Sequence, residues 1–124
     1  MKVKNIRLEI KSEDEFINET KDVMKKLSKG TKVKAKSVIS FESLGVMRKF
    51  ITDERLRILT TVKKYHPSSI YELAKMLERD TKNVSNDVNY LENIGLLEIK
   101  KTNKGRSKST PLVNYDKILL EISV

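Results

Sequence analysis

Cysteine is absent from the sequence, and His66 is its single histidine. Without thiols the chain can form no disulfide and has no cysteine nucleophile, and one imidazole is too few for a zinc site built from His or Cys. We expect no catalytic triad either. His66, next to Pro67, is interpreted as part of a plain turn rather than as a switch, because a lone exposed histidine has nothing to couple to. We therefore expect no metal and no cofactor.

Long hydrophobic runs are also missing. No apolar stretch approaches the roughly 18 residues that a membrane-spanning helix requires. The first residues, Met1–Asn5, are not followed by the apolar core of about 7 to 15 residues that marks a secretory signal. We therefore expect a cytoplasmic protein that does not associate with membranes.

Neighbouring acidic residues do not predict an enzyme. Asp53 and Glu54, like the group Glu13–Glu15, fall at predicted helix starts, where the positive end of the helix dipole accounts for them. No pair is arranged for general acid–base chemistry. We therefore expect a protein without catalytic residues.

Positive charge, by contrast, is abundant. The 124 residues, the length of one ordinary domain, include 26 Lys and Arg against 17 Asp and Glu, and the formal net charge is +9. This balance favours polyanionic partners, because each Lys or Arg placed on a phosphate releases condensed counterions. Nucleic acid is the first candidate, although lysine-rich surfaces also keep many enzymes soluble.

The N-terminal part of the chain is typical of a strand followed by a helix. Ile6–Ile10 alternates apolar and charged residues, a period of two that predicts a half-buried strand. Ser12 and Glu15 form a capping box, and Gly30 supplies a stop signal for the helix that follows. We predict that residues 1–38 form a strand-helix extension. The apolar face of its helix contains Phe16, Thr20, Val23, Met24 and Leu27.

Two further helices are predicted before Pro67. Ser43 is the expected N-cap of a short helix that continues to Phe50, and Thr52 is the expected N-cap of a helix over residues 53–65. The positions expected to face inward are Leu44, Met47, Ile51, Ile58, Leu59 and Val62.

A pair of helices separated by a short turn comes next, as in a helix-turn-helix. Ser69 and Glu72 form a second capping box, which opens the first of them. Asp80 or Thr81 caps the second helix, and Gly95 ends it. The expected buried stripes are Ile70, Leu73, Ala74 and Leu77 in the first helix and Val84, Val88 and Leu91 in the second.

A β-hairpin is predicted directly after these helices, with residues 96–101 paired to residues 111–115 across the polar loop 102–110. Consecutive helices, a tight turn and a hairpin with a basic tip follow one another in the order of a winged helix. We therefore predict an α+β, mainly α fold, with a winged helix-turn-helix DNA-binding domain over residues 39–124. Ile118–Ile122 would close it as a strand or short helix.

The helix after Asp80 is the candidate reading helix. At 100° per residue, its apolar stripe leaves an amide-rich face on the opposite side. Asparagine can form two hydrogen bonds to adenine, and lysine can donate to guanine or to phosphate. Asparagine also costs about 0.5 kcal/mol per helical site relative to alanine, so its repetition favours a role beyond helix stability. The alternative is the ordinary polar surface of an amphipathic helix. The residues expected at the DNA bases are Thr81, Lys82, Asn83, Asn86, Asn89 and Tyr90, with Asn93 on the same face.

The predicted hairpin tip is basic and has no acidic residue. Its glycine, Gly105, allows a tight turn. The alternative to phosphate or minor-groove contact is a solvated hairpin that its lysines protect from aggregation. Ser69 and Tyr71 are further candidates for phosphate contact, because the first N–H groups of a helix can bind anions. The hairpin residues expected at the DNA backbone are Lys101, Lys104, Arg106 and Lys108.

Motifs across residues 39–122 resemble one family. They are Ile39-Ser-Phe-Glu-Ser-Leu and its continuation to Thr52, Ser69-Ile-Tyr-Glu-Leu-Ala-Lys, Asp80-Thr-Lys-Asn-Val-Ser-Asn-Asp-Val, Leu91-Glu-Asn-Ile-Gly-Leu-Leu and Pro111-Leu-Val-Asn-Tyr-Asp-Lys-Ile. The sequence is similar to the MarR/ArsR-type predicted transcriptional regulators of archaea and bacteria, some of which are encoded like antitoxins. The resemblance implies a DNA-binding winged helix, with Lys82, Asn83 and Asn86 near the bases and Lys104–Lys108 beside the backbone. Metal-sensing relatives use Cys and His ligands that this chain lacks, so we expect no response to metals.

The function expected from these observations is a sequence-specific regulator that binds double-stranded DNA, most simply as a homodimeric repressor at a palindromic site. Either the segment Ile6–Leu27 or the C-terminal apolar segment could supply the dimer interface. One alternative is an autoregulating antitoxin whose N-terminal part binds a toxin-like protein. Others are an assembly module that binds only proteins and an architectural protein that coats DNA without sequence preference.

Overall fold

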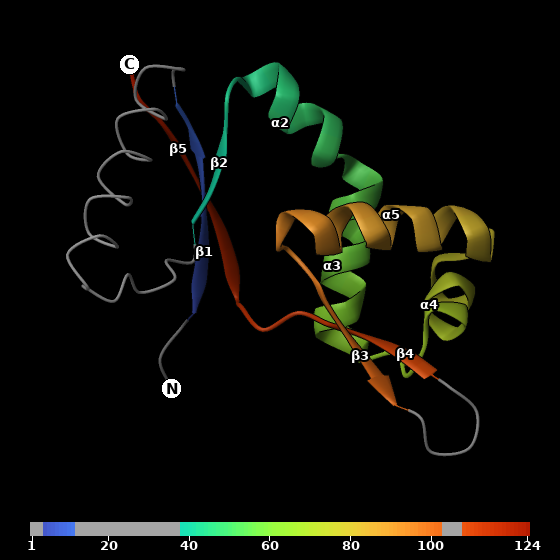
Figure 1. The fold of residues 1–124 in the computed structure, drawn as a ribbon. Helices are drawn as coiled ribbons and strands as arrows, with labels where there is room; N and C mark the ends of the chain where they lie inside the picture. Colours follow the sequence, from blue (N-terminus) through green and yellow to red (C-terminus); the bar gives the residue numbers. More distant parts are fainter. Residues whose placement is uncertain (1–3, 12–37, 103–107) are drawn as a thin grey trace, which may run out of the picture. The chain divides into compact units, whose positions relative to one another are not determined.

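The computed structural model of the protein describes residues 4–11, 38–102 and 108–124. The predicted helix after Ser12, with Gly30, and the loop residues Lys104, Gly105 and Arg106 lie outside the described residues. Within them the chain forms an α+β fold of four helices and five strands (Figure 1), and no helix among these is both long and apolar enough to cross a membrane. In chain order the elements are β1 (Asn5–Ile10), β2 (Val38–Phe41), α2 (Leu44–Phe50), α3 (Asp53–Tyr65), α4 (Ile70–Leu77), α5 (Thr81–Ile94), β3 (Glu98–Thr102), β4 (Lys108–Leu112) and β5 (Lys117–Ile122).

The chain divides into two compact units. The first comprises Met1–Arg48 together with Asp116–Val124, and the second comprises Lys49–Tyr115. This division differs from the boundary predicted at residue 38. β1 pairs with β2 on one side and with β5 on the other, so strands from both ends of the sequence belong to one sheet. Pairing between strands so far apart leaves no local pattern from which the boundary could be predicted.

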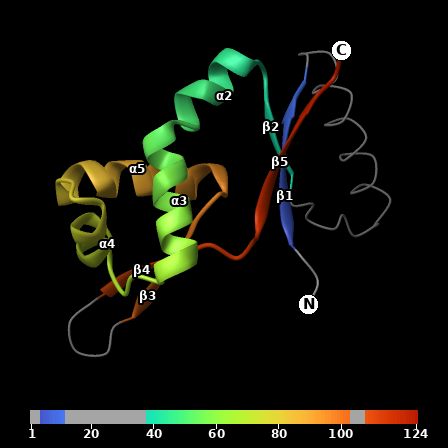
Figure 2. The same ribbon diagram turned by 180° about the vertical axis from the view of Figure 1, so that it is seen from behind.

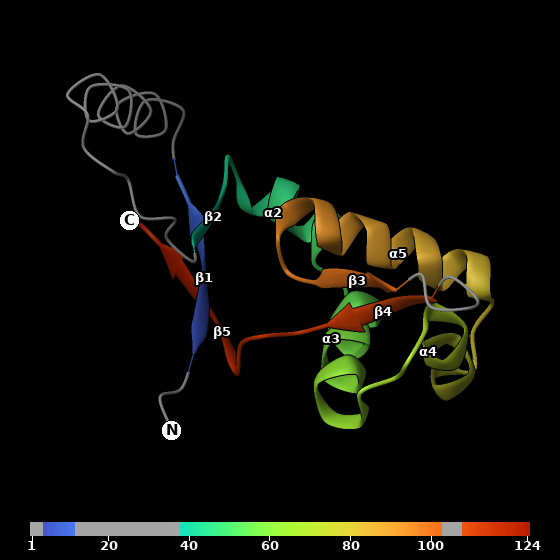
Figure 3. The ribbon, with the colours of Figure 1, turned by 60° about the horizontal axis from the view of Figure 1, so that its bottom comes forward.

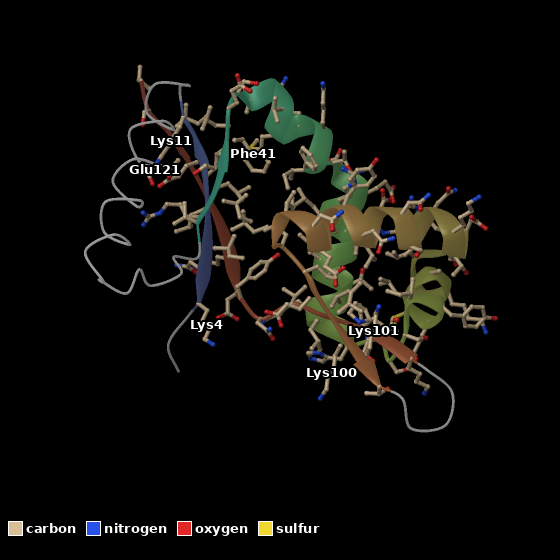
Figure 4. The ribbon with its side chains drawn as sticks, viewed as in Figure 1. Lys4, Lys11, Phe41, Lys100, Lys101 and Glu121 are labelled. Atoms are coloured by element: carbon tan, nitrogen blue, oxygen red, sulfur yellow. The ribbon has the colours of Figure 1, made fainter. Side chains whose placement is uncertain are left out.

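The sheet of the first unit is parallel throughout, in the order β2-β1-β5. Leu8 of β1 lies beside Ile39 of β2 and Leu120 of β5. Because side chains alternate along a strand, one face of the sheet is apolar and the other is largely polar. Figure 4 shows Phe41 and Glu121 on opposite faces. The strand predicted near the N-terminus is confirmed, and of the two conformations predicted for the C-terminal apolar segment the strand is the one that forms.

Helices α3, α4 and α5 pack together in the second unit (Figure 2), and their apolar stripes form its core. These are the residues that helical periodicity predicts, except that Ile70 is only half-buried. Burial of one such large side chain contributes roughly 1.5–3 kcal/mol, so the core fixes which face each helix turns outward. The buried residues are Ile58, Leu59, Val62, Leu73, Ala74, Leu77, Val84, Val88 and Leu91, joined by Leu96 and Leu97 after α5.

The short helix α2 is capped as predicted but is oriented differently at its start. The Ser43 Oγ accepts a hydrogen bond from the Val46 N–H at 3.1 Å. Met47 is buried, whereas Leu44 is 36% exposed, so the prediction that Leu44 faces inward is wrong. Leu44 is the first residue of the helix, and a side chain there points back beyond the helix start, away from the turn that buries Met47.

The helices of the second unit begin at their predicted caps. The side chains of Thr52 and Ser69 accept hydrogen bonds from backbone N–H groups three residues later, at 3.2 and 3.1 Å. Of the two candidates for α5, Asp80 is the cap, and it accepts from the Asn83 N–H at 3.3 Å. Gly95 ends α5 with a φ of 90°, in the left-handed region that favours glycine. Residues 78–80 are thus the whole turn between α4 and α5.

The hairpin of β3 and β4 is displaced from the predicted one. β4 begins at Lys108, so polar residues predicted for the loop belong to the strand, and it ends at Leu112 rather than at Tyr115. Polar residues pair here because the backbone forms the ladder and one face of a hairpin can face water. The Thr110 hydroxyl donates to the Ser68 carbonyl at 2.8 Å, which ties β4 to the start of α4 (Figure 3).

Tyr115 closes the second unit beyond the hairpin. Its hydroxyl donates a hydrogen bond to the Leu96 carbonyl at 2.6 Å. Burial raises the pKa of Tyr115, so the hydroxyl keeps its proton and continues to donate across the ordinary pH range. The segment that leaves β4 is therefore held against Leu96, two residues beyond the end of α5.

Candidate nucleic-acid interface

α5 turns one face to the core of its unit and the opposite face to solvent. Val84, Val88 and Leu91 are fully buried on the inner face. This orientation of the helix is the predicted one, while contact with DNA stays a prediction. The residues predicted at the bases are all exposed: Thr81, Lys82, Asn83, Asn86, Asn89 and Tyr90.

The exposed face of α5 is rich in amides that have no hydrogen-bond partner among the described residues. Within the described part of the chain, the side chains of Asn83, Asn86, Asn89 and Asn93 form no hydrogen bond. Three of these asparagines, with Tyr90, line an open hollow on the surface. Amide donors and acceptors that are already exposed can pair with base edges without first breaking an internal bond.

The acidic residues of α5 lie on the two flanks of this face. α5 contains two acidic residues, Asp87 and Glu92. The Asp87 carboxylate is held by two arginines, and Glu92 lies about 100° around the helix from Asn93, beside the buried stripe. Lys82 adds positive charge to the centre of the outer face, which suits an approach to a polyanion.

The rotation of α5 is fixed by charged residues on its side toward α3. The Asp87 carboxylate accepts hydrogen bonds from Arg55 Nε at 3.2 Å and from Arg79 Nη2 at 2.9 Å. Arg55 also donates to the carbonyls of Lys49 and Phe50, at 2.6 and 2.9 Å. The side chains of Arg55, Asp87 and Arg79 are only 12%, 18% and 24% exposed. Charge-assisted hydrogen bonds in such a shielded place are strong, so they hold the amide-rich face outward.

Tyr90 lies at the border between this anchor and the exposed face. The Arg55 guanidinium carbon lies 4.5 Å from the centre of the Tyr90 ring, and the Phe50 ring meets it edge-on at 6.3 Å. The side chain is still 50% exposed. Tyr90 therefore has a packing role that the sequence did not predict, beside its predicted place at the bases.

The start of α4 holds the two residues predicted at phosphates. The Ser69 hydroxyl accepts from the Glu72 N–H, as a cap does. The Glu72 carboxylate accepts hydrogen bonds from the hydroxyl and the backbone N–H of Ser68 rather than from Ser69. These hydrogen bonds, the hydroxyl's first, lower the pKa of Glu72. Tyr71 is 59% exposed, and Lys75 Nζ lies 4.7 Å from its ring centre. Lys75, which the sequence analysis did not single out, adds positive charge next to Tyr71.

The hairpin contributes the second cluster of basic side chains. Lys100, Lys101 and Lys108 are exposed on β3 and β4, and Figure 4 labels the first two. Lys104 and Arg106, predicted for the same surface, lie outside the described residues. β4 lies against α3 and α4, so the described lysines stand on a strand pair that is fixed to the helical core.

The anchoring group of Arg55, Arg79 and Asp87 is what the sequence analysis missed. Arg55 and Asp87 are 32 positions apart, and Arg79 belongs to the turn before α5. The one available signal was an acidic residue on the flank of an otherwise amide-rich helix. Nothing in the local pattern could identify the two arginines as its partners.

A family model named HVO_A0114 matches residues 50–120, more than half of the chain. The chain belongs to the HVO_A0114 family. No curated protein matches the sequence. The part shared with the HVO_A0114 family runs from the end of α2 into β5, so it includes α3, α4, α5 and the hairpin. Every residue of the candidate interface therefore lies in the segment that defines the family.

Proposed function

We propose that this member of the HVO_A0114 family has a winged helix-turn-helix domain and regulates transcription by binding a specific sequence of double-stranded DNA. α4 and α5, with the three-residue turn between them, would be the helix-turn-helix. The hairpin of β3 and β4 would be the wing. The protein would act as a homodimer on two half-sites and repress by occluding a promoter.

The observation that carries the proposal is the outer face of α5. It is exposed, amide-rich and internally unpaired in the described residues, while its inner face and its flank are held by the core and by Asp87. A surface serving solubility alone does not need asparagines, which weaken a helix. A surface that reads bases needs both the amides and the rigid support.

The dimensions of α5 suit the major groove. Its 14 residues correspond to about 21 Å of helix, and the groove of B-DNA, about 12 Å wide, admits a helix. In helix-turn-helix proteins the N-terminal residues of the second helix reach the bases. Lys82, Asn83 and Asn86 would take that place. The exposed lysines of the hairpin would then neutralise phosphates beside the site.

The test is binding of the full chain to the DNA upstream of its own gene and to a scrambled duplex, by fluorescence anisotropy at two salt concentrations. We expect the upstream DNA to bind at least about 1,000-fold more tightly, the lower end of the ratio for specific regulators. Equal affinity for both duplexes would contradict sequence-specific recognition and favour an architectural role. No binding to either by a folded protein would contradict DNA binding itself.

A further inference from the structure

β5 forms an open edge of the sheet in the first unit. It is the outer strand in the order β2-β1-β5, and no described strand pairs with its other side. Three of its large apolar side chains are exposed: Leu119 by 41%, Leu120 by 49% and Ile122 by 49%. The strand has six residues in continuous register with β1 and contains no proline. Natural edge strands usually carry a proline, a bulge or a central charge that prevents pairing, and β5 has its two charges near its ends.

We propose that this edge is the dimer interface, with β5 paired antiparallel to β5 of a second copy and the two-fold axis at Leu119. In this register Lys117 faces Glu121 of the second copy, and Ile118 faces Leu120. Leu119 faces itself across the axis. The pairing therefore joins opposite charges twice and apolar side chains three times.

Neighbouring registers lack this match. With the axis at Leu120, Lys117 faces Ser123, and Leu119 faces Glu121. With the axis at Ile118, Lys117 faces Leu119, and Asp116 faces Leu120. In the Leu119 register, β5 is therefore complementary to a second, antiparallel copy of itself. A two-fold interface between identical chains requires such self-complementarity.

The sheet as a whole also favours this partner. Residues directly opposite in an antiparallel pair point to the same face, so the apolar face of one copy would continue into that of the other. The result is a six-stranded sheet with the two copies of β5 at its centre. Glu121 already contacts Arg7 Nε at 3.3 Å, but both side chains are more than half exposed, so this ion pair contributes little and leaves the carboxylate accessible.

The inference extends the proposed function by giving the dimer its surface, and it can be tested without DNA. Sedimentation of the full chain over a range of concentrations measures the dimer dissociation constant for the wild type and for Lys117→Glu, Glu121→Lys and the double exchange. Each single change should raise the constant at least about tenfold, because two attractive contacts become repulsive. The double exchange should return it to within about threefold of the wild type. Lys64→Glu on α3 makes the same change in net charge as Lys117→Glu, far from β5 in the sequence, and should have no effect.

Leu119→Lys is a second variant, which sets two lysines against each other on the axis and should give a monomer. Circular dichroism checks that each variant is folded. The proposal is overturned if the wild type stays monomeric at all concentrations, if the double exchange is no tighter than the single changes, or if folded Leu119→Lys dimerises like the wild type. Failure of the proposed function would appear separately: the wild-type protein would form the dimer but would not bind the upstream DNA.

Discussion

Replacing Asp87 with alanine is expected to lower the free energy of unfolding by about 3 kcal/mol. Its carboxylate is shared by Arg55 at 3.2 Å and Arg79 at 2.9 Å, and all three side chains are less than one quarter exposed. Removal leaves two shielded guanidinium groups without their common anion. Arg79 has little else to hold it among the described residues, where its Nη1 forms no hydrogen bond and only an ion pair with the Glu54 carboxylate at 3.6 Å.

Urea denaturation followed by far-UV circular dichroism measures this loss. Asp53→Ala is the matched control, because Asp53 is exposed in the first turn of α3, where the helix dipole gives it about 0.5 kcal/mol. The importance assigned to the Asp87 anchor is contradicted if the Asp87 variant loses no more stability than the Asp53 variant.

The variant Lys82→Ala/Asn83→Ala/Asn86→Ala is expected to lose at least about 100-fold of the preference for upstream over scrambled DNA. Each contact between a side chain and a base edge contributes roughly 1–3 kcal/mol of discrimination against the wrong base. A difference of about 1.4 kcal/mol corresponds to a tenfold ratio of dissociation constants. Affinity for scrambled DNA should fall far less, because a single positive charge is removed. The three residues are exposed, and their side chains form no hydrogen bond or ion pair within the described part of the chain, so the variant should fold like the wild type.

Fluorescence anisotropy on both duplexes measures the ratio. The control is Lys4→Ala/Asn5→Ala, which removes one lysine and one amide from the first unit and should leave the preference unchanged. If the triple variant retains the wild-type preference, the base contacts do not come from the outer face of α5. If the control loses as much as the triple variant, the loss follows from charge rather than from reading of bases.

The helices and their inner faces were predictable because their signals are local. The caps Thr52, Ser69 and Gly95 each act within a few residues, and the buried stripes of α3 and α5 follow a period of 3.6. Such features depend on one segment at a time. The outward face of α5 was predictable for the same reason, since it is the complement of Val84, Val88 and Leu91.

Most of the features that were missed depend on contacts between distant segments. The parallel sheet joins β1 to β5, more than 100 positions later, and so places the end of the chain in the first unit. The hydrogen bond between Arg55 and Asp87 also joins distant segments. So does the hydrogen bond from Thr110 to the Ser68 carbonyl, which accompanies the earlier start of β4. Leu44 was mispredicted because periodicity ignores the direction of a side chain at a helix end.

The central claim is that the amide-rich face of α5 lies against base edges, and a cleavage reagent on that face tests it most directly. Because the chain has no cysteine, Asn86→Cys creates a unique thiol to which an iron chelate can be attached. On upstream DNA saturated with the conjugate, we expect cleavage confined to a few base pairs inside the protected site. A chelate on Asn5→Cys in the first unit should not reproduce these cuts. Cleavage absent from the protected site, or the same for both conjugates while both remain bound, would contradict the account.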